Sequence, residues 1–257
     1  LCPQDPGSYS MTAAFVSGNA VRLAAQDARQ QILSVASSMM ETDPESLDLR
    51  DHRIYLKVDP QKAIPLEDAI RLAFLKGNPP LGRGTYIPKP ISPKVWADPQ
   101  AGKFYGQYGP TYTFGCAVAE VDVDMETGKV TINSLILVND VGFAINPMVV
   151  EGQMESYSGL VLGHLMLEKH EWDEKGRLLT DSLQSFHLPT SLDIPPISSN
   201  LMDGFDQAGP YGAKDTGPTG GVSGAIINAI YDAAGIVISE LPISAETLLK
   251  AIREKQR

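Results

Sequence analysis

The residues with the clearest chemical potential lie in a glycine-rich stretch, which reads QAGPYGAKDTGPTGGVSGAIINAIYDAAG over positions 207–235. Lys214 and Asp215 stand together among its glycines, and from Ala225 onward the apolar residues recur at helical spacing. A glycine-rich loop that enters a helix gathers backbone N–H groups at the positive end of the helix dipole, where an anion can bind. The pattern therefore predicts an anion-binding loop, and the alternative is an ordinary flexible turn before a helix.

A second group of candidate residues lies in a helical pattern over 148–166, in which Gly152, Gly159 and Gly163 recur. Glycine inside a helix costs about 1 kcal/mol relative to alanine. Several glycines in one helix therefore indicate the close approach of another backbone or of a ligand. Gln153 and Glu155 are the polar residues there that could serve a site. The alternative is a glutamine at the helix start and a solvent-facing glutamate.

Composition narrows the class of protein. The chain has 257 residues, 43% of them hydrophobic, and a formal net charge of −10, which is typical of a globular protein and argues against non-specific nucleic-acid binding. No segment approaches the roughly 20 apolar residues of a membrane span. Two cysteines give no disulfide framework, so we expect a cytoplasmic location.

The opening LCPQDPGSYS has no initiator Met and suggests a piece of a longer polypeptide, or a subunit that completes a domain begun on another chain.

The elements that must position these residues are mixed. Helical patterns cover 19–40, 65–75, 148–166, the residues after the glycine-rich loop, and 244–253. Strand patterns cover 47–58 (a pair of strands), 119–124 with 130–138 (a hairpin), 168–179 (a second hairpin) and 236–239. The Pro/Gly-rich stretch 79–110 is a candidate internal boundary. Separate hairpins and helices predict an α+β fold.

Three acidic residues alternate along the first hairpin strand: Glu120, Asp122 and Asp124. We interpret them as the solvent face of an edge strand rather than as a metal site, because no other ligand-type residue lies nearby in sequence. His and Cys pairs at metal-binding spacing are also absent from the sequence, so we expect no protein-ligated metal.

Three stretches, read together and in order, resemble the molybdenum-binding part of the xanthine dehydrogenase family, the molybdenum hydroxylases. They are DPGSYSMTAAFVSGNAVRLAAQDAR at 5–29, a set running through AEVDVDMETGKV (119–130), DVGFAINPMVVEGQ (140–153) and FHLPTSLDIP (186–195), and GPYGAKDTGPTGG with the following helix at 209–244. The resemblance implies an α+β molybdenum-cofactor-binding domain of the xanthine dehydrogenase type, and residues 1–257 would form its C-terminal half. A preceding segment or a partner chain would complete that region.

The resemblance also implies a cofactor, partners and site residues. The cofactor is molybdopterin with molybdenum, with a cytosine dinucleotide form as one option, and the pterin rather than the protein carries the metal. A 2Fe-2S cluster and FAD are expected on partner chains, the Fe–S subunit and a flavin subunit. The matching positions that would contact the cofactor are Ser10, Met11, Thr12, Gln153, Lys214, Asp215, Thr216 and Gly217.

The match to the family pattern has one chemically decisive departure. The family pattern usually reads Gly-x-Gly-Glu, or an equivalent ending in glutamate, at 215–218, and that glutamate acts as the general base. The reaction that the resemblance implies is hydroxylation or dehydrogenation of an aromatic, heterocyclic or aldehyde substrate, or reduction of a CoA ester. This sequence has Pro218 in place of the glutamate, and proline cannot take a proton. Asp215 and Glu155 are the candidate substitutes.

Two alternatives remain open beside a catalytic oxidoreductase subunit. One is a catalytically degenerate subunit that holds the cofactor or the assembly for an active partner. The other is an unrelated phosphate-ligand binder that uses the loop at 209–221, although this loop lacks the Gly-Lys-Ser/Thr ending of such binders.

Overall fold

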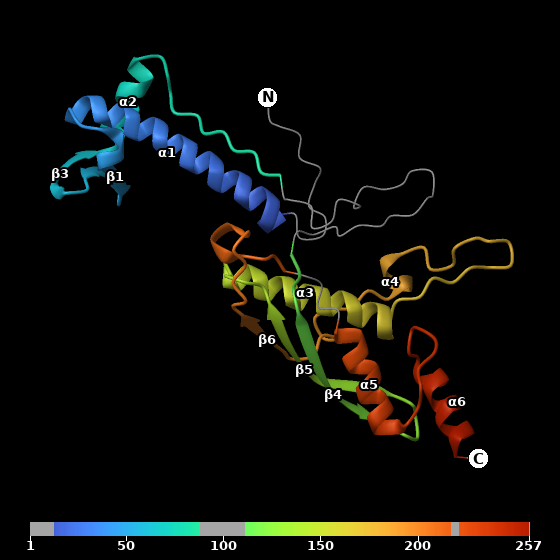
Figure 1. The fold of residues 1–257 in the computed structure, drawn as a ribbon. Helices are drawn as coiled ribbons and strands as arrows, with labels where there is room; N and C mark the ends of the chain where they lie inside the picture. The colour runs from blue at the N-terminus through green and yellow to red at the C-terminus, as the bar shows by residue number, and fades with distance from the viewer. Residues whose placement is uncertain (1–12, 88–110, 217–220, 257) are drawn as a thin grey trace, which may run out of the picture. The chain divides into compact units, whose positions relative to one another are not determined.

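The computed structural model describes residues 13–87, 111–216 and 221–256. The chain divides into two compact units, residues 1–110 and residues 111–257. Each unit has its own hydrophobic core (Figure 1).

The first unit pairs a long helix with a small antiparallel sheet. A turn of π-helix, Ala13–Ser17, leads into α1 (Gly18–Met40), and a 3-10 turn, Pro44–Ser46, precedes the sheet. The sheet has the strand order β1 (Leu47–Arg50), β2 (Arg53–Leu56) and β3 (Asp59–Pro65), and α2 (Leu66–Leu75) follows it. The apolar faces of α1, the sheet and α2 meet in a core formed by Leu33, Ala36, Met40, Leu47, Ile54 and Ala69. The predicted helices at 19–40 and 65–75 and the predicted strand pair are confirmed, and β3 is an addition.

The second unit is a three-stranded mixed sheet covered by helices. The strand order is β4 (Gly115–Val123), β5 (Val130–Asp140) and β6 (Ile197–Met202), with β4 antiparallel and β6 parallel to β5. The helices are α3 (Pro147–Met166), the short α4 (Leu183–Phe186), α5 (Val222–Ala234) and α6 (Ala245–Lys255). A 3-10 turn at Pro210–Gly212 interrupts the loop between β6 and α5. The connection from β5 to β6 contains α3, as a parallel crossover requires a long connection.

The core of the second unit lies between one sheet face and the helices α3, α5 and α6. Leu135 and Leu137 of β5 are fully buried and pack against Met154 of α3 and Ile226 and Ile230 of α5. Because successive strand residues point to opposite faces, Ile136 lies on the other face of the sheet, where 44% of its surface is exposed. The loops that leave β5 and β6 lie at the same end of the sheet, because the two strands are parallel (Figure 1).

The first hairpin agrees with its prediction. β4 is an edge strand, and Glu120, Asp122 and Asp124 are exposed. Asp124 also shapes the turn, because its carboxylate accepts a hydrogen bond from the backbone N–H of Glu126 at 2.8 Å. That bond stabilises the ionised form and lowers the pKa of Asp124. The interpretation of these carboxylates as a solvent face is therefore consistent with their surroundings.

One predicted hairpin and one predicted strand are wrong. The segment 168–179 contains only an isolated bridge between Trp172 and Leu178, so it turns back on itself without forming two strands. The segment 236–239 has no strand assignment. Ile236 is buried in the core while Val237 is 77% exposed, so this apolar run packs on the core by one side without a partner strand. The sequence patterns assigned no residue range to β6.

The remaining helices are as predicted. Helices α3, α5 and α6 match the patterns at 148–166, after the glycine-rich loop, and at 244–253, and Ser244 caps α6 by accepting a hydrogen bond from the N–H of Thr247 at 3.1 Å. Within the parts of the chain that the structure describes, none of the helices has the length and apolar character needed to cross a bilayer.

Candidate functional site

The residues predicted from the sequence fall into three groups in the structure. Ser10, Met11, Thr12, Gly217 and Pro218 lie outside the described residues. Lys214, Asp215 and Thr216 lie in the loop that follows β6, directly before residues 217–220, which the structure does not describe. Gln153 and Glu155 lie on α3.

The loop is held against the connector that leaves β5. The backbone N–H of Lys214 donates to the carbonyl of Val141 at 2.9 Å, and the N–H of Phe143 donates to the carbonyl of Gly212 at 3.1 Å. On the other side, the N–H of Val141 donates to the carbonyl of Met202 at 3.2 Å. Residues 140–143 therefore lie between the end of β6 and the segment 212–214, and they join the two.

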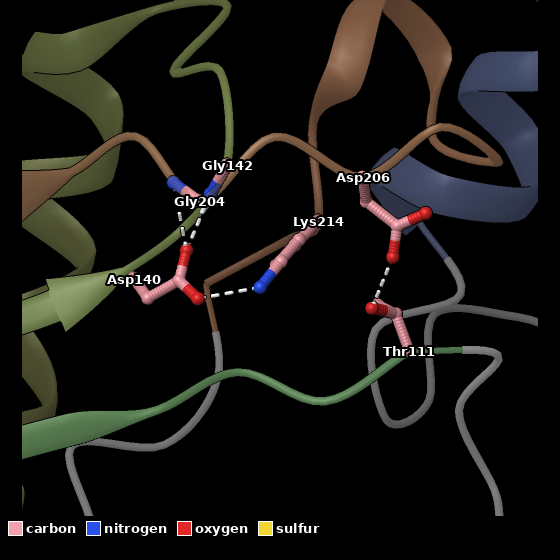
Figure 2. A network of polar contacts seen from close by, with 6 residues as sticks. All are labelled: Thr111, Asp140, Gly142, Gly204, Asp206 and Lys214. Carbon is pink, nitrogen blue, oxygen red and sulfur yellow. Dashed lines mark hydrogen bonds and ion pairs between the residues drawn. The ribbon is translucent and has the colours of Figure 1, made fainter.

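An ion pair lies at the centre of this arrangement (Figure 2). The Nζ of Lys214 is 2.5 Å from the Oδ2 of Asp140, and only 11% of the lysine side chain and 14% of the aspartate side chain are exposed. The Oδ1 of Asp140 accepts from the backbone N–H groups of Gly142 at 3.2 Å and of Gly204 at 3.1 Å. The lysine ammonium also lies 5.7 Å from the centre of the Phe114 ring. The sequence analysis identified Lys214 but not Asp140.

A second polar contact holds the loop at its outer end. The Oγ1 of Thr111, which precedes β4, donates to the Oδ2 of Asp206 at 2.5 Å, and the Oδ1 of Asp206 accepts from the N–H of Ala208 at 2.9 Å (Figure 2). The loop is thus fixed by side chains at two points, one near residue 206 and one at residue 214.

Close packing requires glycine at one position of the connector after β5 and at two positions of the loop after β6. A Cβ at Gly142, where φ is +61°, would lie 2.2 Å from the carbonyl oxygen of Gly212. A Cβ at Gly204 would lie 2.2 Å from the Oδ1 of Asp140, and one at Gly212, where φ is +90°, would meet the ring of Phe205. Here glycine lets chain segments approach one another.

Asp215 has an unusual backbone conformation. Its φ is +134°, a region that favours glycine, and its Oδ1 accepts a hydrogen bond from the N–H of Thr216 at 2.7 Å. A non-glycine residue in such a region costs about 1–3 kcal/mol and is found where the surroundings fix the conformation, often at functional sites. The family pattern that this sequence resembles has glycine at this position, which agrees with the backbone that the structure shows.

Helix α5 begins shortly after this loop. Its N-cap is Gly221, which has no side chain to cap the first N–H groups, and its first residue, Val222, is fully buried in the core. A helix start without a capping side chain keeps its positive end available to an anion.

In the described structure, the candidate residues on α3 make no hydrogen bond or ion pair with Lys214 or Asp140. Gln153 and Glu155 are exposed, and within the described residues neither side chain makes a hydrogen bond. The glycines of α3 differ from one another. A Cβ at Gly163 would meet Glu168 and Pro189, one at Gly159 would contact Ile194 at 3.3 Å, and none of the described atoms lies within 4 Å of a Cβ at Gly152.

Gly152→Ala is therefore expected to raise the free energy of unfolding by about 1 kcal/mol, because alanine has the higher helix propensity and meets nothing in the described structure. Thermal unfolding of the purified protein measures this change. A lower melting temperature would contradict the prediction and would show that another chain or a ligand approaches α3 at this point.

The described residues contain no group of three or more His, Cys, Asp and Glu side chains arranged to hold a metal ion. The polar groups gathered at this end of the sheet are a lysine ammonium, a threonine hydroxyl, backbone N–H groups and the carboxylates of Asp140 and Asp206. The threonine hydroxyl and the N–H groups already donate to these carboxylates, so the ammonium of Lys214, which has three donors, is the group that suits an anionic ligand.

Comparison with known proteins agrees with this geometry. The family model described as a molybdopterin cofactor-binding domain matches residues 1–195. The xanthine dehydrogenase molybdenum-binding subunit of Escherichia coli O157:H7 is 29% identical over 96% of this chain and 31% of its own length. The carbon monoxide dehydrogenase large chain of Hydrogenophaga pseudoflava is 27% identical over 98% of this chain and 30% of its own length.

The fold agrees as well. The crystal structure of quinoline 2-oxidoreductase from Pseudomonas putida 86 superposes with a TM-score of 0.77, at 24% identity, over 96% of this chain and 31% of that chain. The chain spans about a third of the length of the curated relatives it matches. The predicted α+β fold of the molybdenum-cofactor-binding type is confirmed, and the chain belongs to the molybdopterin cofactor-binding domain family.

Proposed function

We propose that this chain is part of the molybdopterin-binding subunit of a multi-subunit oxidoreductase. The substrate would be an aromatic, heterocyclic or aldehyde compound that is hydroxylated or dehydrogenated, or a CoA ester that is reduced. The observation that carries the proposal is the buried Lys214, fixed at the end of the loop that enters the uncapped α5, in a chain of this family. Relatives named as xanthine and carbon monoxide dehydrogenases support the reaction class.

The residues present fit an anionic pterin. Lys214 has three ammonium donors, and the hydrogen bond to Asp140 uses one of them. Thr216, the N–H groups at the start of α5 and the amide of Gln153 are the other donors that would hold the cofactor, as would Ser10, Met11, Thr12 and Gly217. When bound, the cofactor supplies two-electron redox chemistry, and this chain binds and orients it.

Asp215 is the better of the two candidates for the general base. It is half-buried at the end of the loop, directly after the fixed Lys214, and its strained backbone is maintained by its surroundings. Glu155 is exposed on α3. The carboxylate of Asp215 would accept the proton that the family glutamate takes at the position of Pro218.

A catalytically degenerate subunit is the alternative, and Pro218 is the observation that favours it. Proline has no group that titrates, so a chain that relied on this position for proton transfer would be inactive. Such a chain would still bind the cofactor, or would stabilise the assembly around an active partner.

The proposal includes partners that this chain does not encode. The N-terminal half of the molybdenum subunit would complete the binding region, on a preceding segment or a partner chain. A subunit with a 2Fe-2S cluster and a subunit with FAD would carry the electrons away. The pterin would be the cytosine dinucleotide form, and the complex would be cytoplasmic.

The test is elemental and pterin analysis of the complex purified from its native host. We expect molybdenum and pterin in equal amounts with this chain, and release of cytidine monophosphate on acid hydrolysis. A folded, assembled complex that contains neither molybdenum nor pterin would contradict cofactor binding. A complex with cofactor but no turnover on any substrate of the class would favour the degenerate subunit.

A further inference from the structure

We propose that Asp140 is a positioning residue for the cofactor-binding loop: it fixes Lys214 and thereby sets the point from which residues 215 and 216 begin. This inference rests on the proposed function, because it assigns the pinned loop to cofactor binding. Asp140 has no role in the sequence-based prediction, which treated the stretch around it only as part of the resemblance to the family.

The carboxylate of Asp140 connects the end of β5 to two points of the loop that follows β6. Its Oδ2 accepts from the Nζ of Lys214 at 2.5 Å, 74 residues away. Its Oδ1 accepts from the N–H of Gly204 at 3.1 Å and from the N–H of Gly142 at 3.2 Å. Asp140 is itself the last residue of β5, a strand that is paired on both sides. Its carboxylate therefore ties the loop to the end of the central strand of the sheet (Figure 2).

Burial makes the ion pair a strong constraint. Lys214 is 8% exposed, and a lysine so buried requires a partner. A carboxylate that accepts two N–H bonds besides the ammonium is well compensated for its loss of water. The Phe114 ring, 5.7 Å from the ammonium, covers the pair on one side, and the N–H of Asp140 donates to the carbonyl of Phe114 at 2.8 Å. The lysine side chain therefore has one arrangement.

The position of Lys214 in the chain gives this arrangement its consequence. Among the described residues, Lys214 is the last residue of the loop whose backbone is bonded to the connector, through the carbonyl of Val141. The next described residue that is apolar and buried is Val222, the first residue of α5, which belongs to the core. The side chain of Asp140 therefore fixes the position of the residue that precedes Asp215 and Thr216, and Asp140 is itself held in the sheet.

A purely stabilising ion pair would have different properties. Replacing both members of a buried pair with neutral residues commonly restores stability, because no unpaired charge remains. Positioning is not restored in this way, since the neutral pair no longer sets the distance between Asp140 and residue 214. Stability and cofactor content should thus separate in the double variant.

The experiment compares four variants of the full chain, purified with its partners. Asp140→Asn keeps Lys214, Lys214→Met keeps Asp140, and the double variant Asp140→Asn/Lys214→Met has neither charge. Asp48→Asn is the matched control, because Asp48 also forms an ion pair at 2.5 Å, with Arg29. That pair lies in the other unit, and it is more exposed: 37% of the Asp48 side chain and 42% of the Arg29 side chain are accessible.

The first measurement is amide hydrogen exchange of residues 203–216 in cofactor-free protein. We expect exchange there to become about tenfold faster in each single variant and in the double variant, and to remain unchanged in Asp48→Asn. The second measurement is the molybdenum content of the complex. We expect it to fall about tenfold in all three variants of the pair, although the double variant melts within a few degrees of the unaltered protein.

Unchanged exchange at 203–216 in the folded double variant, with full molybdenum content, would overturn the proposal. So would loss of molybdenum in Lys214→Met alone with full content in Asp140→Asn, since that result shows that Lys214 holds the cofactor without needing Asp140 to position it. If the unaltered complex holds no molybdenum, the proposed function is wrong, and the exchange measurement still decides whether Asp140 fixes the loop.

Discussion

Asp215→Gly is expected to lower turnover by about 10²–10⁴-fold while leaving the protein at least as stable as the unaltered chain. The loss of activity follows from removing the proposed general base, whose contribution is of that order. The stability follows from the backbone, because a φ of +134° suits glycine and strains an aspartate by about 1–3 kcal/mol. Glycine also has more conformational freedom in the unfolded chain, and this lowers the free energy of unfolding by about 1 kcal/mol, which offsets part of the strain energy that is removed.

Two measurements check this prediction: steady-state turnover of the cofactor-loaded complex and thermal unfolding of the same preparation. Asp215→Asn should lose turnover equally, but it should keep the strain and gain no stability. Glu155→Gln serves as the control, and we expect both its turnover and its melting temperature to remain near those of the unaltered protein. Full turnover in Asp215→Asn would remove Asp215 from the mechanism, and loss of turnover in Glu155→Gln would assign the base to α3.

The sequence predicted the fold where local patterns agree with the tertiary structure. The hairpin of β4 and β5 was found from its alternation, because one face of the sheet packs on helices and the other is exposed. The strand β6 was missed, because it is a short run with serine and asparagine that is defined by parallel pairing with β5. Pairing between distant segments leaves little trace in local composition. The predicted strand at 236–239 failed for the opposite reason, since its run of apolar residues packs on the core without a partner strand.

The candidate site was predictable in residue type but not in arrangement. Lys214 was identified because a lysine among glycines before a helix is conspicuous, and its family match placed it beside the cofactor. Its partner Asp140 lies 74 residues earlier, and no spacing rule connects the two. One signal could have pointed to it, namely an aspartate two residues after the predicted end of a strand, followed two residues later by glycine. The positive φ of Asp215 is likewise invisible in the sequence without the family pattern, which has glycine there.

Gly142→Ala is expected to destabilise the second unit by about 3 kcal/mol or more and to release the loop that contains Lys214. The new Cβ would lie 2.2 Å from the carbonyl oxygen of Gly212, and backbone atoms cannot move aside as a side chain can. The connector and the segment 212–214 must then separate. That separation would weaken the bonds from Lys214 to Val141 and from Phe143 to Gly212, each worth about 1 kcal/mol, and the left-handed conformation adds about 1 kcal/mol.

Thermal unfolding should show this effect as a fall of about 6–12 °C in the melting temperature. Gly176→Ala is the matched control, because Gly176 also has a positive φ, +76°, but a Cβ there meets none of the described atoms within 4 Å. It carries the conformational cost of about 1 kcal/mol without the clash. Because the backbone contact at Gly142 and the carboxylate of Asp140 hold the same loop, Gly142→Ala should also reduce molybdenum content, whereas Gly176→Ala should not. Equal effects of the two alanines on stability would show that the close approach of the two segments does not stabilise the loop.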